Sequence, residues 1–433
     1  MIQVVLLLGG KGTRLGLSDR PKPMVDFLGR PLLEHALITL RDQGCTDFLF
    51  LVSHMQAAIE AHFGDGSAFG VRIRSVADPD GLGTAGATIA ASAELQPEFL
   101  LVYGDLLFDI DVARLCNFAR SRGGHGALVV HPNGHPHDSD LIDADADDRI
   151  LAIHRKPHPE ALPWRNLANA GIAYLTGEAL SDASSAPQEE LDWARHVWPA
   201  AVDRGSRYYA YRTLEYIKDI GTPERLARGR VDLAANRPAR CSARTARACV
   251  FLDRDGVINR QIDSVRRPEE LQLLPGAEAA IAALNQAAVP VICVTNQPGI
   301  AKGEFSHADL NAVHAELDRR LALRGAYLDD LYYCPHHPMR GFPGEVASLK
   351  INCECRKPRP GMLIWAAKRY NLDLARSVLI GDHDRDIAAG LTAGCHTIAV
   401  PTNQGAMHTT PIGATHAAAD IAGAIDIALA ITR

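Results

Sequence analysis

Apolar runs of strand length alternate along the chain with longer segments of helical character. Short continuous runs of this kind are typical of strands that are buried on both faces of a parallel sheet. They lie at Val4–Leu8, Phe48–Val52, Phe99–Val102 and Ala127–Val130 in the first half, and at Val250–Leu252, Val289–Val294, Ser377–Ile380 and Thr397–Val400 in the second. The pattern therefore predicts an α/β protein with a parallel sheet in each half.

Residues 235–247 interrupt this alternation near the middle of the chain. They are small and basic and show no hydrophobic period, which is typical of a linker. Since 433 residues favour two or three domains, we predict one domain over residues 1–234 and another over residues 248–433.

The stretch Pro132–Asp148 is rich in His, Asp, Gly and Asn, and it predicts a long loop before a strand near Ile150. His131, His135 and His137 lie in or beside it. They would suit a metal, but a solvated loop is the interpretation that we favour.

Composition and charge exclude several classes of function. A formal net charge of −6 argues against binding to a nucleic acid backbone. No apolar run approaches the ~20 residues that a membrane-spanning helix needs. The apolar N-terminus lacks the basic region and cleavage site of a signal peptide, so we expect a strand there. Most cysteines are isolated, as in a cytoplasmic protein, whereas Cys334, Cys353 and Cys355 cluster with histidines, which indicates a metal site.

The first apolar run leads into a glycine-rich loop with an arginine. Glycines let backbone N–H groups approach phosphate oxygens, and a guanidinium group suits a triphosphate. The glycine spacing fits neither the dinucleotide-binding fingerprint nor the Walker A loop, so the loop alone is equally compatible with a tight turn. Lys22 follows in Pro21–Met24, where two prolines hold it in a rigid segment. The candidate loop residues are Gly9, Gly10, Gly12, Thr13 and Arg14.

These motifs, in this order, resemble the sugar-1-phosphate nucleotidyltransferase family over residues 1 to about 233. The resemblance implies that a sugar phosphate attacks the α-phosphorus of a nucleoside triphosphate, with release of pyrophosphate. It places Lys22 and Arg14 at the reacting phosphates and Mg²⁺ on Asp105 and Asp219. It also implies nucleotide contacts from Gly83 and Thr84 and sugar-phosphate contacts from Lys156, Asn169 and Gly171. Arg155 departs from the family, which usually has glutamate there.

The second half carries polar residues at the ends of its strands. Asp253 and Asp255 follow the run Val250–Leu252, and Thr295 and Asn296 follow the next run. A basic segment contains Lys357, and Asp382 and Asp386 follow the strand Ser377–Ile380. This order resembles the haloacid dehalogenase phosphatases. The predicted fold is therefore α/β, with two Rossmann-like three-layer domains, the second without a large cap.

The residue types indicate a mechanism. Asp253 is expected to attack phosphorus and form an aspartyl-phosphate, while Asp255 donates a proton to the leaving oxygen and later accepts one from water. Lys357 and Thr295 would hold the phosphoryl oxygens, and Asn296 is a further substrate-binding candidate. Asp253, Asp382 and the carbonyl of Asp255 would bind Mg²⁺, with Asp386 orienting Lys357.

A cysteine-rich loop precedes the lysine. Three thiolates and one imidazole suit a tetrahedral structural Zn²⁺, although the spacing is tighter than usual. His337 competes with His336, which we prefer, and the expected ligands are Cys334, His336, Cys353 and Cys355. This arrangement resembles the heptose-bisphosphate and histidinol-phosphate phosphatases, over residues 247 to about 405. Arg356 would then bind a second phosphate group, which favours a bisphosphate as the substrate. His383 replaces the Lys or Arg that is usual in relatives.

The two halves make sense together if one produces the substrate of the other. We predict a bifunctional enzyme of the GDP-heptose route that acts on heptose 1,7-bisphosphate, heptose 1-phosphate and GTP. One alternative is a histidinol-phosphate phosphatase fused to a mannose or glucose transferase. Another is a phosphatase regulated by a nucleotide-sugar-sensing domain. We expect small-molecule partners, with neither nucleic acid nor membrane, and the oligomeric state stays open, a homo-oligomer included.

Overall fold

Two units make up the chain, and each has its own sheet and core. A computed structural model describes residues 2–9, 15, 20–53, 55–78, 81–159, 164–185, 190–401 and 411–432. The first unit contains Met1–His131, Ser139–Lys156 and Ala168–Ser242, and the second contains Pro132–Asp138, Pro157–Leu167 and Ala243–Arg433. The sequence pattern does not predict that two segments of the first half join the second unit.

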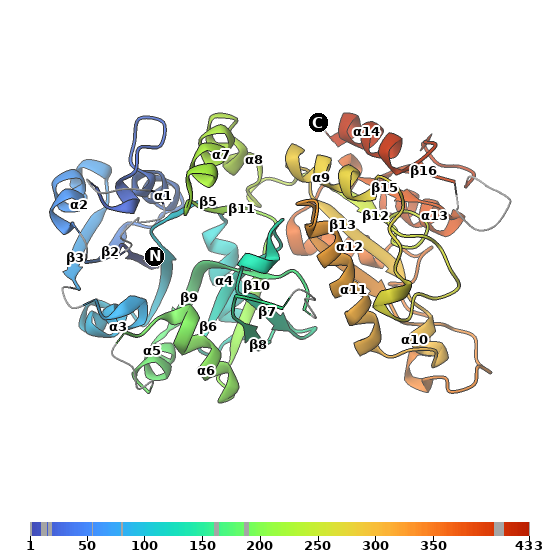
Figure 1. Cartoon of the computed structure of the whole chain (residues 1–433), viewed down its shortest axis with the longest axis horizontal. Helices are drawn as coiled ribbons and strands as arrows, with labels where there is room; N and C mark the ends of the chain where they lie inside the picture. The colour runs from blue at the N-terminus through green and yellow to red at the C-terminus, as the bar shows by residue number, and fades with distance from the viewer. Residues whose placement is uncertain are drawn as a thin grey trace. The chain divides into compact units, whose positions relative to one another are not determined.

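The sheet of the first unit has the strand order β10-β6-β9-β4-β1-β2-β3, with β7 paired to β9 and β8 paired to β7 (Figure 1). The four strands that the apolar runs predict, β1, β2, β4 and β6, are short and largely buried. The strands are β1 (Gln3–Leu7), β2 (Asp47–Val52), β3 (Arg72–Ala77), β4 (Glu98–Tyr103), β6 (Gly126–His131), β7 (Leu141–Ala144), β8 (Ile150–His154), β9 (Ala168–Thr176) and β10 (Tyr208–Arg212).

Two predictions for this unit are wrong. The sheet is mixed, because β9 runs antiparallel to both β4 and β6. A parallel strand needs a crossover connection, usually a helix, whereas the chain reaches β9 from the antiparallel pair of β7 and β8 with no helix in the described part of that connection. In addition, residues 132–148 are not one long loop, since they contain β7. The strand expected near Ile150 is present as β8.

Helices flank the first sheet, and local signals set their ends. In α4, the side chain of Asp111 accepts a hydrogen bond from the Arg114 N–H at the start, and Gly123, with a φ of 65°, ends the helix. A separate pair, β5 (Leu106–Asp109) and β11 (Tyr216–Asp219), is antiparallel. The helices are α1 (Leu32–Arg41), α2 (Gln56–Phe63), α3 (Gly83–Ala90), α4 (Val112–Arg122), α5 (Gly177–Ser184), α6 (Trp198–Asp203), α7 (Pro223–Ala234) and α8 (Arg237–Arg240).

The sheet of the second unit is parallel at every strand pair, as predicted. Its order is β14-β13-β12-β15-β16-β17, so the strand before Asp253 is central. The strands are β12 (Val250–Leu252), β13 (Val291–Asn296), β14 (Asp330–Cys334), β15 (Val378–Gly381), β16 (His396–Ala399) and β17 (His416–Ala417). Parallel strands place all their carboxyl ends at one edge, where the chemistry of α/β proteins is found.

Among the described residues, six helices accompany this sheet, and α9 and α14 pack against each other (Figure 1). A capping box of Ser306 and Asp309 starts α11, the longest of them. Their bounds are α9 (Ala277–Ala287), α10 (Gly299–Lys302), α11 (His307–Ala322), α12 (Gly361–Tyr370), α13 (Asp384–Ala393) and α14 (Ile421–Thr432). The predicted linker contains α8, and Arg247 at its end pairs with Leu372. No helix in the described ranges is long and apolar enough to cross a membrane.

The buried centre of β1 offers a test of the first core. Leu6 is fully buried there, whereas Leu151 on β8 is 53% exposed. Leu6→Ala should lower the free energy of unfolding of the first unit by about 2–5 kcal/mol, because it removes apolar contacts and leaves a cavity. Leu151→Ala, the matched control, should change it by less than about 0.5 kcal/mol. Equal effects in thermal unfolding experiments would contradict the assigned core.

Candidate active sites

In the second unit, polar residues gather at the carboxyl ends of three neighbouring strands. Asp253 directly follows β12, Thr295 lies near the end of β13, and Asp382 directly follows β15. These three side chains are at most 6% exposed. The parallel register thus brings together residues that lie far apart in the sequence.

Lys357 lies at the centre of this group and is 1% exposed. Its Nζ lies 2.9 Å from Asp253 Oδ1 and 2.8 Å from Asp386 Oδ1. It also donates a hydrogen bond of 2.7 Å to the Val294 carbonyl. Two ion pairs and one hydrogen bond therefore hold the ammonium group in position. The sequence predicts that Asp386 orients Lys357, and the structure brings the two side chains into contact.

Asn296 fixes the backbone of the same lysine. Its Nδ2 donates to the Lys357 carbonyl at 3.0 Å, and its Oδ1 accepts from the Lys357 N–H at 3.0 Å. The amide of Asn296 therefore holds the peptide of Lys357 from the end of β13. This contact gives the side chain a positioning function in addition to the substrate contact that the sequence predicts.

Three carboxylates surround this lysine. Oxygens of Asp253, Asp382 and Asp386 lie within 4.8 Å of one another, and all three residues are buried. Burial first, and then the charge of Asp386, raise the pKa of Asp253 to about 7, against the opposing charge of Lys357. A buried group of three carboxylates around one ammonium group fits a hard cation with oxygen ligands. Gly256 lies against the Asp382 carboxylate, where a Cβ atom would overlap it.

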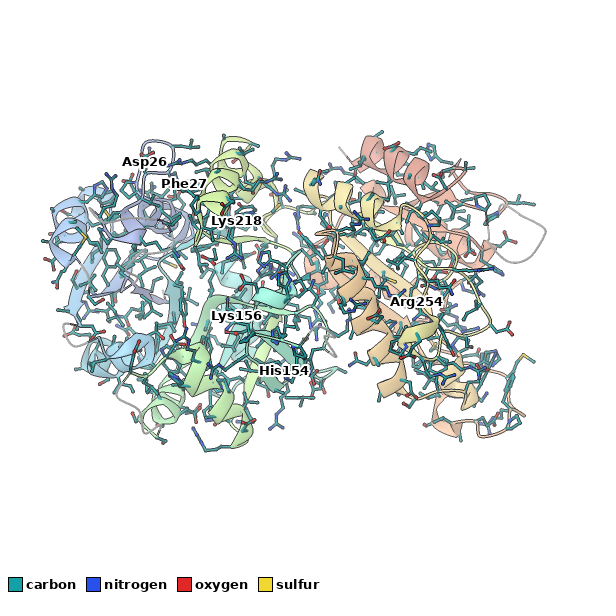
Figure 2. All side chains as sticks on the ribbon, in the orientation of Figure 1. Asp26, Phe27, His154, Lys156, Lys218 and Arg254 are labelled. Atoms are coloured by element: carbon teal, nitrogen blue, oxygen red, sulfur yellow. The ribbon has the colours of Figure 1, made fainter. Side chains whose placement is uncertain are left out.

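Asp255 is held by a network that the sequence does not predict. The guanidinium group of Arg254 contacts both of its carboxylate oxygens, with Nη2 at 3.0 and 2.9 Å. Asn259 donates to Oδ1 at 2.9 Å, and Gln297 donates to Oδ2 at 2.8 Å. Arg254, labelled in Figure 2, also contacts His314 of α11. The position of Arg254 between the two aspartates is the only feature of the sequence that indicates its contact with Asp255.

Gln297 also orients the predicted phosphate ligand Thr295. Its Nε2 donates to the Thr295 hydroxyl oxygen at 2.9 Å. Because that oxygen accepts a hydrogen bond from inside the protein, its own proton can point toward a phosphate at the strand ends.

The four predicted zinc ligands lie together. Cys334, His336, Cys353 and Cys355 offer ligand atoms within 4.8 Å of one another. The Sγ atoms are 3.2 to 3.5 Å apart, close to the ~3.8 Å edge of a tetrahedron with Zn–S bonds of ~2.3 Å. His336 Nδ1 lies 3.3 Å from Cys355 Sγ, whereas His337 Nδ1 faces the Met339 carbonyl. The geometry thus favours His336 over His337.

Two further residues of this unit have defined contacts. Arg356 is half-buried, and its Nη1 donates to the His336 carbonyl at 3.3 Å, which ties it to the cysteine loop. His383 is the N-cap of α13, where its Nδ1 accepts from the Arg385 N–H at 3.3 Å. A capping function explains how histidine fits a position where relatives usually have Lys or Arg.

In the first unit, the structure brings Lys22, Asp105 and Asp219 together. Lys22 is 7% exposed, and its Nζ lies 2.5 Å from Asp105 Oδ2 and 3.6 Å from Asp219 Oδ1. Arg225 holds the other Asp219 oxygen at 2.6 Å. Asp219 Oδ1 is buried and accepts no hydrogen bond from the described residues. Two carboxylates, one with a buried oxygen without a hydrogen bond, fit a magnesium ion.

The predicted nucleotide loop begins α3. Gly83 has a φ of 78°, and a Cβ atom there would overlap the Leu191 backbone, so glycine is required. The Thr84 hydroxyl donates to Asp192 Oδ2 at 2.8 Å. Of the first glycine-rich loop, Gly9 is described, and the Ser53 hydroxyl contacts its carbonyl at 3.4 Å. Gly10, Gly12, Thr13 and Arg14 lie outside the described residues.

The predicted sugar-phosphate contacts share one partner, Asp140. Its carboxylate accepts from the Lys156 N–H at 3.1 Å, and its carbonyl accepts from the Asn169 N–H at 2.9 Å. The Asn169 side chain in turn accepts from the Gly171 N–H at 3.1 Å. Lys156 and Arg155 are exposed, and Figure 2 labels Lys156 in the first unit. Asp140 thus connects both predicted contacts, although no sequence motif indicates it.

Comparison with known families identifies the first half. Residues 3–236, more than half of the chain, match the model of the nucleotidyl transferase family. The chain belongs to this family. It is 34% identical over 237 residues to mannose-1-phosphate guanylyltransferase of Mycobacterium tuberculosis, which covers 54% of this chain and 64% of that relative.

The second half of this nucleotidyl transferase belongs to a phosphatase family. Residues 354–424 match the HAD-hydrolase-like family. Over 157 residues the chain is 43% identical to D-glycero-beta-D-manno-heptose-1,7-bisphosphate 7-phosphatase of Bordetella bronchiseptica, which covers 36% of this chain and 82% of that relative. One solved structure that resembles this half is the crystal structure of D,D-heptose 1,7-bisphosphate phosphatase from B. bronchiseptica, complexed with magnesium and phosphate. Its sequence identity to this chain is 40%, and its TM-score is 0.37. The match covers 42% of this chain and 98% of that chain. The protein is therefore an enzyme with both a phosphatase and a nucleotidyltransferase activity.

The hydrogen bonds of Asn296 can be tested with a matched control. Asn296→Ala removes two hydrogen bonds to Lys357 and should lower phosphatase kcat about tenfold, since ~1.4 kcal/mol is a factor of ten. Asn285 makes the same reciprocal pair of hydrogen bonds with the Tyr327 backbone, so Asn285→Ala should leave kcat within about twofold of the wild type. If both variants lose kcat equally in a phosphate-release assay, Asn296 has no specific function at the site.

Proposed function

We propose that the protein removes the 7-phosphate of D-glycero-α-D-manno-heptose 1,7-bisphosphate and then transfers a guanylyl group from GTP to heptose 1-phosphate. One observation carries the proposal: a single chain joins a nucleotidyl transferase to a phosphatase whose relative is named for the 7-phosphate of heptose 1,7-bisphosphate. Hydrolysis at C7 leaves a sugar 1-phosphate, which is the substrate that such a transferase requires. This reaction pair belongs to the GDP-heptose route.

The comparisons support GTP as the nucleotide, and they also concern the anomer of the heptose bisphosphate. The transferase relative is named a guanylyltransferase for mannose 1-phosphate, and a D-manno-heptose has the ring configuration of mannose. The phosphatase relative is named for the β anomer. We assign the α anomer because the transferase fold resembles that of the GDP-heptose route, so the test must include both anomers.

The phosphatase residues support hydrolysis in two steps. Asp253 attacks phosphorus to form an aspartyl-phosphate, and the bond from phosphorus to the sugar oxygen breaks. Asp255 donates a proton to that oxygen, then accepts a proton from the water that hydrolyses the aspartyl-phosphate. Lys357 and Thr295 hold the phosphoryl oxygens, and Arg356 would bind the phosphate that stays on the sugar.

Both sites have residues that would hold Mg²⁺. In the second unit these are Asp253, Asp382 and the backbone carbonyl of Asp255, and in the first unit Asp105 and Asp219. The bound cation would neutralise phosphate charge, which lowers the barrier for an anionic nucleophile.

The transferase residues support a direct displacement. An oxygen of the sugar 1-phosphate attacks the α-phosphorus of GTP, and the bond to the β-phosphate breaks, which releases pyrophosphate. Lys22, held between two carboxylates, neutralises charge on the reacting phosphates. Arg14, Gly9, Gly10, Gly12 and Thr13 would bind the triphosphate, with Gly83 and Thr84 at the base. Lys156, Asn169 and Gly171 would bind the sugar phosphate.

We also propose that Cys334, His336, Cys353 and Cys355 bind a structural Zn²⁺. The loop would then frame the substrate in a phosphatase without a large cap. The separations of the four ligand atoms support this proposal, as does the hydrogen bond from Arg356 to the His336 carbonyl, which joins the loop to the active site.

Two variants test the assignment of the two activities. Full-length protein is supplied with either anomer of heptose 1,7-bisphosphate, GTP and Mg²⁺, and phosphate, pyrophosphate and GDP-heptose are measured. Asp253→Asn should abolish phosphate release but leave GDP-heptose formation from heptose 1-phosphate intact. Lys22→Ala should do the reverse. Preference for the β anomer would overturn the anomer assignment, and faster turnover of mannose 1-phosphate would overturn the sugar assignment.

The proposed zinc site is tested by metal analysis of purified variants. Cys353→Ala removes one thiolate and should lose the bound zinc, with a lower unfolding temperature of the second unit. Cys395 is a buried cysteine outside the cluster, so Cys395→Ala should keep the metal. Wild-type protein that contains no zinc after expression with zinc supplied would refute the site.

A further inference from the structure

Two segments from the first half of the sequence are part of the phosphatase unit. They are residues 132–138 and 157–167, within the range that matches the nucleotidyl transferase family. Asn133 and Asn166 join them, because the Asn133 N–H donates to Asn166 Oδ1 and Asn166 Nδ2 donates to the Asn133 carbonyl at 2.6 Å. Gly134 lies so close to the Gly325 backbone, just beyond α11, that a Cβ atom would overlap it.

The second segment holds α11 through one buried carboxylate. Arg165 Nε donates to Asp318 Oδ2 at 2.6 Å, and the Asn166 N–H donates to the same oxygen at 3.0 Å. Asp318 is 4% exposed. A buried carboxylate without its counter-ion is strongly unfavourable, so Arg165 fixes the position of this part of α11.

One helical turn before Asp318, and on the same face of α11, lies His314. It is 1% exposed. Burial, together with the charges of Arg254 and Arg165, holds the pKa of His314 well below its usual value, so its imidazole is neutral. Its Nε2 lies 3.1 Å from Arg254 Nη1 and, in the neutral ring, can accept a hydrogen bond from the Nη1–H.

Arg254 connects His314 to Asp255. Its side chain is fully buried. One edge of its guanidinium group contacts His314, while Nε and Nη2 hold Asp255 Oδ1 at 3.1 and 3.0 Å. Because a guanidinium group is planar and rigid, the position of His314 determines the direction in which Arg254 presents the Asp255 carboxylate.

We propose that Arg165 is a positioning residue of the phosphatase reaction, which acts through Asp318, His314 and Arg254 to orient the acid–base carboxylate of Asp255. The proposal rests on the proposed function of Asp255. It makes the phosphatase rate depend on a residue from the nucleotidyl transferase part of the sequence. Arg165 contacts neither substrate nor the reacting atoms, so its effect should be confined to steps that need proton transfer by Asp255.

The test uses the full-length Arg165→Met variant and two substrates, phenyl phosphate and p-nitrophenyl phosphate. With these substrates the result does not depend on knowing the natural substrate. Phenolate is a poor leaving group that needs a proton, whereas p-nitrophenolate leaves without one. In single turnovers with excess enzyme, Arg165→Met should slow release of phenol about tenfold or more, as expected for a misplaced acid. Release of p-nitrophenol should slow by less than about twofold. Arg165→Lys should recover part of the rate with phenyl phosphate.

Controls separate positioning from folding. Arg319 on the same helix pairs with Glu316 at 2.6 Å, so Arg319→Met should leave both rates unchanged. If Arg165→Met slows the release of phenol and of p-nitrophenol equally, Arg165 has only a structural function and the proposal is wrong. The proposal is also wrong if the variant releases phenol at the wild-type rate. If Asp255→Asn leaves release of phenol unchanged, the proposed function of Asp255 itself fails. If Asp255→Asn slows it and Arg165→Met does not, only the present inference fails.

Discussion

The ion pairs of Lys357 with Asp253 and Asp386 are the constraint on which the phosphatase unit depends. All three side chains are almost completely buried. Burial of charges in a protein interior is tolerated only when each charge has a partner of opposite sign and satisfied hydrogen bonds. The lysine meets this condition because Asp253, directly after β12, and Asp386 in α13 supply opposite charge, and β13 supplies the Val294 carbonyl. Loss of either carboxylate would remove an opposite charge from the buried ammonium group.

The same principle explains the order of residues around the nucleophile. Asp253 forms an ion pair with Lys357. Asp255 contacts the Arg254 guanidinium group and accepts hydrogen bonds from two side-chain amides. The two carboxylates are one residue apart but have different partners, which suits them to different functions, nucleophile and acid–base. In the first unit, Lys22 between Asp105 and Asp219 is a comparable arrangement on a different sheet. Both halves thus place a buried lysine among carboxylates that fit a cation.

Local sequence signals are sufficient for the strands and for the residues at their ends. Runs such as Val250–Leu252 coincide with observed strands, because an apolar run and the polar residue that ends it are local features. The direction of β9 and the function of Asp140 are not local. The ion pair of Arg165 and Asp318 joins residues 153 positions apart, and neither residue lies in a recognisable motif. The sequence therefore could not predict that part of the first half would complete the second unit.

We propose that one chain removes the phosphate at C7 of a sugar and attaches a nucleotide to the phosphate at C1. The most direct measurement uses heptose 1,7-bisphosphate with radioactive phosphorus at C1, together with GTP, Mg²⁺ and the full-length protein. We expect the label to appear in GDP-heptose while unlabelled phosphate is released. Release of the label as inorganic phosphate, or hydrolysis without formation of any nucleotide sugar, would contradict it.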